Sequence, residues 1–316
     1  MSETYRFETT AEEVARDLDL SGETIVVTGG SAGLGIETIR VLSMHGARIV
    51  SVVRDPQKGK DAIAQIRESV PKADIEIAEL DLSDLDSVRR GADKIAEKFP
   101  KIDRLINNAG VMACPLGRTA EGLDLQLGTN HLGHFVLTSR LITSVLAGSP
   151  GRIVNLSSAG HQISPIRFDD PFFDKEPYDN WAAYGQAKTA NILFSVGLDK
   201  RFKDRGVHAF AVHPGAIMTE LGRHLQPADI KALMDRRGGR KMEYKSIPQG
   251  AATTVWAATA RDLDGRGGLY CEDSHVAETV EEVGGSSGVM SYALDEVAAD
   301  RLWSLSEEWS GETFPA

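Results

Sequence analysis

The chain has 316 residues, of which 41% are hydrophobic, and a formal net charge of −11. This length fits one large α/β domain or two small ones, and the acidic balance argues against a general nucleic-acid binder. The two cysteines, Cys114 and Cys271, have no metal-type spacing and suit a reducing compartment. The N-terminus does not resemble a signal peptide, and no apolar run reaches the roughly 20 residues of a membrane helix. We therefore expect a cytoplasmic protein without a membrane anchor.

The first structural signals lie near the N-terminus. Residues 1–20 are expected to form an N-terminal extension, in which Thr10 and Glu13 make a capping-box pattern for a short helix over residues 11–18. The apolar run 24–27 predicts a buried parallel strand. Similar signals predict strands at 47–53, 75–80, 102–106, 151–156, 207–212 and 268–271, and helices at 57–69, from a cap at Ser83 onward, within 121–147, and at 181–202, 248–260 and 292–310.

Two segments between these elements have a loop-like composition. Residues 160–180 are rich in Pro, Asp and aromatic residues, and the polar segment 221–246 is expected to be a mobile substrate lid. No internal repeat or domain linker interrupts the chain. Strands that alternate with helices favour a parallel sheet covered on both faces. The sequence therefore predicts a single α/β domain over residues 1–316, with a doubly wound parallel sheet of about seven strands.

The stretch Thr28–Gly35 is a candidate phosphate-binding turn. It reads Thr-Gly-Gly-Ser-Ala-Gly-Leu-Gly and lies between the first predicted strand and a helical pattern. Glycines let the backbone approach a pyrophosphate, and a helix N-terminus offers free N–H groups. The spacing is Gly-x-x-x-Gly-x-Gly instead of the Gly-x-Gly-x-x-Gly of the general dinucleotide fingerprint, so the stretch alone could also be a structural turn.

Polar residues follow several predicted strands, where ligands of doubly wound sheets bind. These residues are Thr28, Arg54, Asp81, Asn107, Ser157 with Ser158, and His213 with Pro214 and Gly215. Tyr184 and Lys188 are four residues apart and share one face of a predicted helix. A nearby ammonium group would favour the phenolate and lower the tyrosine pKa, although the two residues could also be a surface tyrosine and a solvated lysine.

Taken together, these stretches resemble the short-chain dehydrogenase/reductase family, and in particular its retinol-dehydrogenase-like branch. The family motifs that match, in the family's order, are Thr28–Gly35, Asp81 with Leu82, Asn107 to Gly110, Asn130, Ser158, Tyr184 with Lys188, and Pro214 with Gly215. The resemblance to the branch lies in residues 130–135, 152–158, 188–194, 213–215 and 301–303. It implies a Rossmann-type fold and an oxidoreductase.

The resemblance also implies a role for each catalytic residue. Tyr184 would protonate or deprotonate the substrate oxygen, and Lys188 would lower the Tyr184 pKa and hold the nicotinamide ribose. Ser158 would hydrogen-bond the same oxygen, and Asn130 would tie Lys188 to a water chain. Implied contacts with the cofactor involve Gly29, Ser31, Gly33, Leu34, Gly35, Arg54, Asp81 (adenine), Leu82, Asn107, Ala109 and Gly110 (adenosine side), Tyr184, Lys188, and Pro214, Gly215, Ile217 and Thr219 (nicotinamide side).

Arg54 bears on the choice between the two nicotinamide cofactors. An acidic residue after the second strand binds the ribose 2′-hydroxyl of NAD, whereas an arginine accommodates the 2′-phosphate of NADP. Val53 occupies the acidic position and Arg54 follows it, with Ser31 as a second phosphate donor, so the sequence favours NADP. Two alternatives remain: Arg54 could pair with Asp55, or Asp55 could turn inward and favour NAD.

Other residues are weaker candidates. The 160–180 insertion, which also occurs in the branch, brings apolar residues close to the site, and some of them could line a substrate pocket: Ile163, Phe168, Phe172, Phe173, Tyr178 and Trp181. His131 and His134 lack acidic companions, so we expect no metal site there. His213 is expected to form structural hydrogen bonds, Cys114 to be a neutral filler near the substrate mouth, and the basic cluster 236–241 to be a solvated loop.

We therefore expect an NADP-dependent alcohol dehydrogenase or carbonyl reductase that acts on a small apolar alcohol, aldehyde or ketone. The alternatives are a non-catalytic dinucleotide sensor, which need not keep all four catalytic residues, and a sugar-nucleotide epimerase or dehydratase, which usually has a larger substrate domain. The family commonly forms homodimers or homotetramers through its long helices, here at 121–147 and 181–202, although members of this branch can be monomers. Residues 160–180 and 221–246 are expected to determine the substrate.

Overall fold

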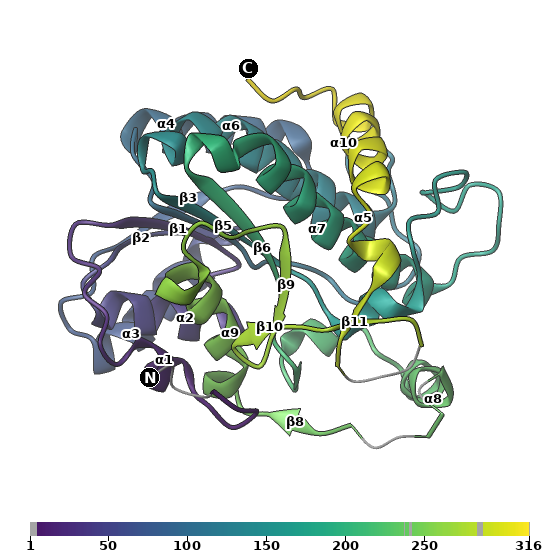
Figure 1. The fold of residues 1–316 in the computed structure, drawn as a ribbon, viewed down its shortest axis with the longest axis horizontal. Helices are drawn as coiled ribbons and strands as arrows, with labels where there is room; N and C mark the ends of the chain where they lie inside the picture. The colour runs from purple at the N-terminus through teal and green to yellow at the C-terminus, as the bar shows by residue number, and fades with distance from the viewer. Residues whose placement is uncertain (1–4, 237, 240–241, 283–286, 316) are drawn as a thin grey trace.

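A mostly parallel sheet forms the centre of the molecule (Figure 1). The computed structural model describes residues 5–236, 238–239, 242–282 and 287–315. The main sheet has the order β10-β9-β6-β5-β4-β1-β2-β3. Its strands are β1 (Thr24–Thr28), β2 (Arg48–Val53), β3 (Ile75–Glu79), β4 (Arg104–Asn107), β5 (Gly151–Leu156), β6 (Val207–His213), β9 (Leu269–Glu272) and β10 (His275–Val276). All neighbours are parallel except β9 and β10, which confirms the predicted doubly wound sheet and adds one short antiparallel edge strand.

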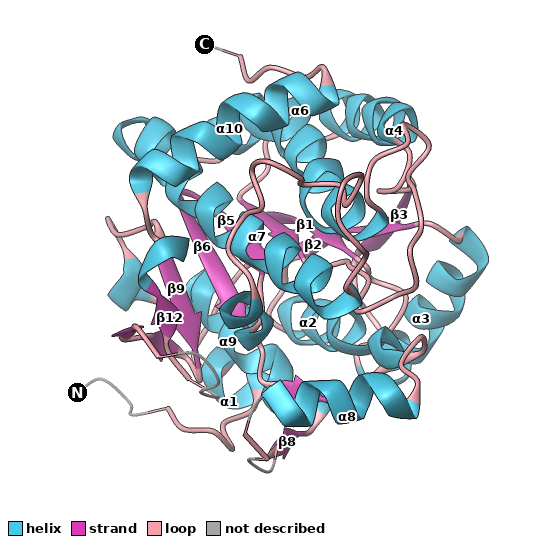
Figure 2. Cartoon of the chain, turned by 90° about the vertical axis from the view of Figure 1, so that its right-hand side faces the viewer, coloured by secondary structure: helices cyan, strands magenta, loops and turns pink. Residues whose placement is uncertain are grey.

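Helices cover both faces of this sheet (Figures 1 and 2). One face carries α1 (Ala11–Ala15), α2 (Gly33–Met44), α3 (Pro56–Ser69) and α9 (Ile247–Thr259). The other carries α4 (Leu85–Lys98), α6 (Gly133–Ala147) and α7 (Asn180–Phe202), with α10 (Glu296–Ser310) packed on α7. This two-sided cover explains why the strand sequences are almost continuously apolar.

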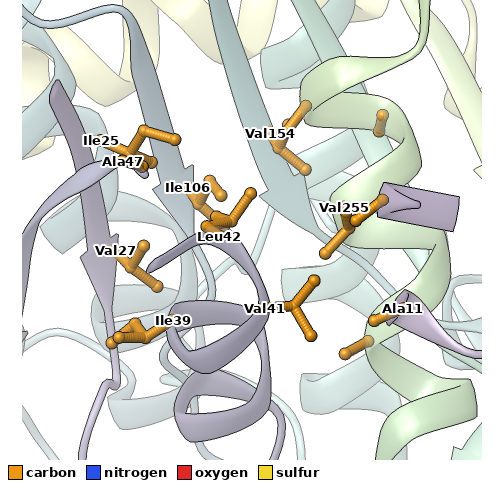
Figure 3. Close-up of a cluster of buried hydrophobic side chains, with 14 of the residues drawn as sticks. Ala11, Ile25, Val27, Ile39, Val41, Leu42, Ala47, Ile106, Val154 and Val255 are labelled. Carbon is orange, nitrogen blue, oxygen red and sulfur yellow. The ribbon is translucent and has the colours of Figure 1, made fainter. Parts of the chain in front are cut away.

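The side chains of β1 alternate between the hydrophobic clusters on the two faces of the sheet. Ile25 and Val27 point into the cluster beneath α2, where Figure 3 shows them near Ile39 and Leu42. Val26, between them, belongs to the cluster on the opposite face. Alternation of side chains along a strand requires this arrangement, and burial of each side chain contributes about 1.5–3 kcal/mol.

Two helix starts depend on local hydrogen bonds. The capping box of Thr10 and Glu13 is present at α1, as predicted, although the helix ends at Ala15. The prediction that Ser83 caps the next helix is wrong, because Asp84 is the N-cap of α4 and accepts from Ser87 N at 2.9 Å. The Ser83 N–H and hydroxyl both donate to Asp81 Oδ1, at 2.9 and 2.7 Å, so Ser83 is held in the preceding turn.

The long helical segment predicted within residues 121–147 is divided into parts. A short α5 (Leu125–Leu127) leads into a π-helical turn, Gly128–Leu132, before α6 begins. At Gly133 a Cβ atom would lie 2.5 Å from Leu82 O, so only glycine allows this close approach to the β3–α4 connection. Single π turns often occur at functional sites, and this one contains Asn130.

The later segments contain more regular structure than their composition suggested. The predicted lid holds α8 (Pro227–Arg236) and β8 (Tyr244–Lys245), and β8 pairs with β7 (Ala216–Ile217). Trp181 Nε1 donates to Asp229 O at 2.9 Å, and Arg236 forms an ion pair with Asp179, so α8 is anchored to the start of α7. Residues 237, 240 and 241 of the basic cluster lie outside the described residues. The remaining short elements are the 3-10 turns Ala159–Ile163, Lys203–Arg205, Glu220–Gly222, Arg261–Leu263 and Ser291–Ala293, with β11 (Thr279–Val280) and β12 (Val289–Met290).

The last helix begins later than predicted. Residues Ser291–Ala293 form a 3-10 turn, and α10 starts at Glu296 after Asp295, whose side chain accepts from Ala298 N at 2.7 Å. An aspartate at the N-cap position explains this start, since its carboxylate satisfies a free N–H of the first turn.

Candidate functional site

A cleft of about 1410 Å³ lies at the carboxyl ends of the parallel strands, where the sequence placed the site. Residues from separate predicted motifs meet in its lining: Leu34, Gly110, Ser158, Tyr184, Lys188, Pro214, Gly215, Ile217 and Thr219. Several other candidates lie outside this lining: Gly29, Ser31, Gly33, Gly35, Arg54, Asp81, Leu82, Asn107, Ala109 and Asn130. The fold therefore brings the proposed acid/base residues and the nicotinamide-side residues to one cavity.

Tyr184 and Ser158 form the reactive wall of the cleft. Tyr184 is 4% exposed, and burial raises the pKa of its hydroxyl to about 12, while a hydrogen bond with Ser158 acts in the opposite direction. Ser158 follows β5 and caps the next turn, where its Oγ accepts from Gly160 N at 3.0 Å. A Cβ atom at Gly160 would lie 2.8 Å from Tyr184 Cε1, so the glycine lets the tyrosine ring pack directly against this turn.

Lys188 lies one helical turn after Tyr184 and is equally buried. Its Nζ donates to Leu156 O at 3.0 Å and lies 5.5 Å from the centroid of the Tyr184 ring. Burial lowers the pKa of Lys188 to about 8. The alternative of a surface tyrosine beside a solvated lysine is thus wrong. The backbone is fixed as well, since Ser157 Oγ donates to Lys188 O at 2.8 Å.

Asn130 joins this group from the π turn. Its Oδ1 accepts from Val111 N at 2.8 Å and its Nδ2 donates to Val111 O at 2.9 Å, so its amide is locked against the strand-to-loop connection after β4. A Cβ atom at Gly110 would lie 2.9 Å from Asn130 Oδ1 and 3.7 Å from Lys188 Nζ. Asn130 and Lys188 therefore both lie close to Gly110.

The glycine turn has the open geometry of an anion site. Gly29 and Gly33 have positive φ angles of 74° and 51°, and a Cβ atom at Gly35 would lie 2.1 Å from Gly29 O. The N-cap of α2 is Ala32, which offers no side-chain hydrogen bond to the first turn. Free N–H groups at a helix N-terminus beside a glycine turn suit a phosphate.

Neighbouring asparagines have different environments. Asn107 is 1% exposed, and its Nδ2 donates to Thr138 Oγ1 and Asn155 Oδ1, so its side chain is held between β4, β5 and α6. Asn108, which the sequence analysis did not single out, lines the cleft and donates to Thr28 O at 2.8 Å. Its place in the Asn-Asn-Ala-Gly motif could have identified it.

Arg54 lies exposed after β2, away from the reactive wall. Asp55 is the N-cap of α3, and its Oδ1 accepts from Gln57 N and Lys58 N at 2.9 and 3.2 Å. No ion pair joins Arg54 to Asp55 in the part of the chain that the structure describes. The Asp55 carboxylate is thus occupied by the helix start.

The insertion supplies only part of the cleft wall. Ile163 and Trp181 line the cleft, and Phe172 packs edge-on against Trp309 of α10 with ring centroids 5.1 Å apart. The residues outside the lining are Phe168, Phe172, Phe173 and Tyr178. Additional apolar lining comes from the predicted lid, through Leu225, Ile230, Leu233 and Met234. The helical spacing of the last three could have predicted this amphipathic segment.

The weaker candidates have structural environments. His134 Nε2 bonds to Thr28 Oγ1 at 2.9 Å and His131 Nε2 to Ser306 Oγ at 2.8 Å; burial lowers their pKa values to about 4 and 3. His213 Nδ1 accepts from Ala159 N at 3.2 Å. Cys114 is buried outside the cleft lining, and burial raises its thiol pKa. Among the described residues, no cluster of His, Cys, Asp and Glu could hold a metal ion, and no helix is long and apolar enough to cross a membrane.

Comparison with known proteins gives one consistent family. The family model described as "short chain dehydrogenase" matches residues 23–170. The chain is 39% identical to short-chain dehydrogenase/reductase prx1 of Penicillium roqueforti over 94% of this chain and 88% of the relative. It is 37% identical to human retinol dehydrogenase 12 over 93% of this chain and 88% of that protein.

Solved structures agree with this result. An uncharacterized protein from Mycobacterium paratuberculosis matches with a TM-score of 0.73 and 34% identity, over 96% of this chain and 98% of the other. A protein described as an NAD(P)-dependent gluconate 5-dehydrogenase from Beutenbergia cavernae, with bound NADP, matches with a TM-score of 0.62 and 25% identity, over 81% of this chain and 96% of the other.

Proposed function

The chain belongs to the short-chain dehydrogenase/reductase family, and on that premise we propose that it is an NADP-dependent oxidoreductase that interconverts an apolar alcohol and its aldehyde or ketone. The observation that carries the proposal is the meeting of Ser158, Tyr184 and Lys188 in one cleft with Leu34 of the glycine turn. A sensor that only binds dinucleotides would not need this buried proton-transfer group.

The residues of the reactive wall have distinct tasks in the proposed reaction. NADPH, when bound, supplies the hydride to the carbonyl carbon. The Tyr184 hydroxyl, which burial keeps protonated, gives its proton to the oxygen that becomes the alcohol. Ser158 donates a hydrogen bond to the same oxygen and so stabilises the charge that develops there. In the reverse direction, Tyr184 accepts the proton from the alcohol.

Lys188 and Asn130 support this proton transfer. The buried Lys188 Nζ lies close enough to the Tyr184 ring to stabilise the phenolate that remains after proton donation. Burial lowers the Lys188 pKa to about 8, so the lysine can pass a proton onward near neutral pH. Asn130, locked to Val111 beside Gly110, connects this lysine to solvent through water in the proposal.

The glycine turn and Arg54 provide the cofactor site in this proposal. The uncapped start of α2 fits a pyrophosphate, and the exposed Arg54 has a guanidinium that fits a 2′-phosphate. Asp55 caps α3 through its Oδ1, and in the proposal it stays at this helix start instead of turning toward the ribose hydroxyls of NAD. The NADP bound to the Beutenbergia relative supports the same choice.

The substrate end of the cleft favours an apolar molecule. Met112, Ile163 and Trp181 face it from one side, and Leu233 faces it from α8, which we propose is the substrate lid. These side chains give the cleft an apolar surface around the body of a substrate, although charged residues such as Asp179 and Arg236 also belong to the lining. An apolar carbonyl compound therefore fits the wall better than a sugar nucleotide, which the epimerase alternative would require.

The proposal is tested by the binding of NADPH and NADH to the purified protein and to Arg54→Ala. A charged hydrogen bond is worth about 1.5–3 kcal/mol, so the variant should bind NADPH roughly ten- to a hundredfold more weakly and NADH unchanged. Equal affinity of the wild type for both cofactors would refute the NADP preference. Binding of NADPH without reduction of any aldehyde or ketone in a substrate panel would favour the sensor alternative.

A further inference from the structure

The cleft has a polar end wall at the carboxyl end of β9, and no step of the proposed reaction uses it. Gln162, Glu272 and Ser287 line the cleft there. Glu272 pairs in the sheet with His213, so the wall lies directly beyond the Pro214 turn on the nicotinamide side. Gln162 belongs to the 3-10 turn that Ser158 caps, which places the wall near the reactive residues as well.

Glu272 is a buried carboxylate without a cationic partner. Glu272 is 4% exposed, and its Oε1 accepts hydrogen bonds from Ser287 Oγ at 2.5 Å and from Gly288 N at 2.8 Å. No hydrogen bond to Oε2 and no ion pair to Glu272 is formed within the described residues. Oε2 is not among the fully buried atoms without a partner, so it stays open to a donor group of a molecule bound in the cleft.

Gln162 also has a side-chain oxygen without a donor among the described residues. The residue is 3% exposed, and its Nε2 donates to Ser287 O at 3.2 Å and Gly288 O at 3.3 Å. Its Oε1 is buried and has no hydrogen-bond partner among the described residues. Both donors of the amide group therefore face the chain, while its acceptor remains unfilled, and Gln162 and Glu272 bond to the same two residues, Ser287 and Gly288.

Lys245 forms an ion pair with Asp273, and none with Glu272 within the described residues. The side chain of Lys245 is 1% exposed, and its Nζ lies 2.5 Å from Asp273 Oδ1 and 4.9 Å from the centroid of the Phe7 ring. This pair neutralises Asp273, the next residue after Glu272, and leaves Glu272 uncompensated. The wall is thus rich in acceptors and poor in donors.

We propose that Glu272 and Gln162 form a second recognition point, which binds a hydrogen-bond-donating group of the substrate, a hydroxyl or an ammonium group. The substrate would then be bifunctional: its reacting carbon lies at Ser158 and Tyr184, and its donor group reaches the wall at the end of an apolar body. This inference rests on the proposed function, because it concerns the substrate of that site.

The test compares three sets of straight-chain methyl ketones of graded length, whose far end carries a hydroxyl group, a methoxy group or only hydrogen. The wild type, supplied with NADPH, should prefer the hydroxyl ketone over its methyl ether at one chain length by roughly tenfold in kcat/KM, mostly through KM, as expected for a hydrogen bond to a charged group. The methoxy group keeps the acceptor but removes the donor, so this pair isolates donation.

Glu272→Gln should reduce this preference severalfold, because it removes the charge while an amide oxygen can still accept from Ser287 and Gly288. The control is Glu97→Gln, on the exposed surface of α4, which should keep the wild-type preference. An amino ketone of the optimal length distinguishes an ammonium donor from a hydroxyl donor by a further gain in wild-type kcat/KM.

Two results would overturn the inference. One is equal kcat/KM for the hydroxyl ketones and their methyl ethers at every length in the wild type. The other is a preference that survives in Glu272→Gln, which would leave Glu272 only the task of holding residues 287 and 288. If no ketone is reduced, the proposed function fails instead. The proposed recognition point is then tested by thermal unfolding alone. Diols must raise the Tm of the wild type more than their dimethyl ethers do, and this difference in Tm must be smaller in Glu272→Gln.

Discussion

The contact between Gly160 and Tyr184 allows a sharp test of the reactive wall. A Cβ atom at position 160 would lie 2.8 Å from Tyr184 Cε1 and 3.0 Å from Cδ1. In Gly160→Ala, the ring or the turn must move by about 0.6 Å to restore an ordinary contact of 3.4 Å. The φ angle of Gly160 is not in the left-handed region, so the substitution adds no backbone strain there; the new Cβ would also lie 3.3 Å from Ser158 Oγ, a smaller overlap than that with the ring.

The displacement should reduce activity more than stability. A misplacement of about 1 Å can cost a hundredfold in rate, so a shift of roughly half that size should lower kcat/KM about tenfold. Overpacking typically costs about 1–3 kcal/mol, and each kcal/mol lowers the Tm of a 316-residue protein by about 1.5 °C. The dissociation constant for NADPH should change little, because the glycine turn and Arg54 lie away from position 160. Steady-state kinetics, thermal unfolding and cofactor titration measure these three effects.

A double-mutant cycle provides the control. The stability cost of Gly160→Ala should persist in Tyr184→Phe, which keeps the ring, and largely disappear in Tyr184→Ala, which removes it. The reasoning would be refuted if Gly160→Ala kept its kcat/KM within about twofold, or if its stability cost were the same in both tyrosine variants.

Three further predictions follow from the same site. Tyr184→Phe should lower kcat by about 10²–10⁴-fold with NADPH binding intact, as measured by single-turnover kinetics and titration. Burial lowers the Lys188 pKa from 10.5 to about 8. The free energy of unfolding of the wild type, relative to that of Lys188→Met, should therefore rise by about 3 kcal/mol between pH 8 and pH 10.5, as measured by urea unfolding. A difference between the two proteins that does not change with pH would contradict this. Because α10 and Phe172 cover the outer face of α7, light scattering should show a monomer at micromolar concentration; a stable dimer through α7 would contradict it.

The strands and the reactive pair could be predicted from the sequence because their signals are local. A parallel strand buried on both faces is a continuous apolar run, and β5 (Gly151–Leu156) was predicted to the residue. The four-residue spacing of Tyr184 and Lys188 predicts that they share one helix face, whereas the roles proposed for them come from the resemblance to the family.

Features that depend on distant contacts could not be predicted in this way. The π turn at Gly128–Leu132 accompanies the hydrogen bonds of Asn130 to Val111 and the close approach of Gly133 to Leu82, which residue patterns do not show. Ser83 and Asp84 are both good caps one position apart, and the Asp81 side chain decides between them. The Glu272 wall requires the knowledge that β9 lies beside β6.

Different stretches of the chain contribute the proposed reacting residues and the remaining lining of the cleft. In the proposed reaction, Ser158, Tyr184 and Lys188 lie on the continuous stretch 158–188, whereas further lining of the cleft comes from described residues within 216–236 and 242–244 and from Glu272, Asp273 and Ser287. Natural variation in residues 221–246 can therefore alter what enters, while Ser158, Tyr184 and Lys188 keep their proposed chemistry. An engineer could likewise exchange residues 221–246 between relatives as a cassette and expect altered selectivity with the same reaction.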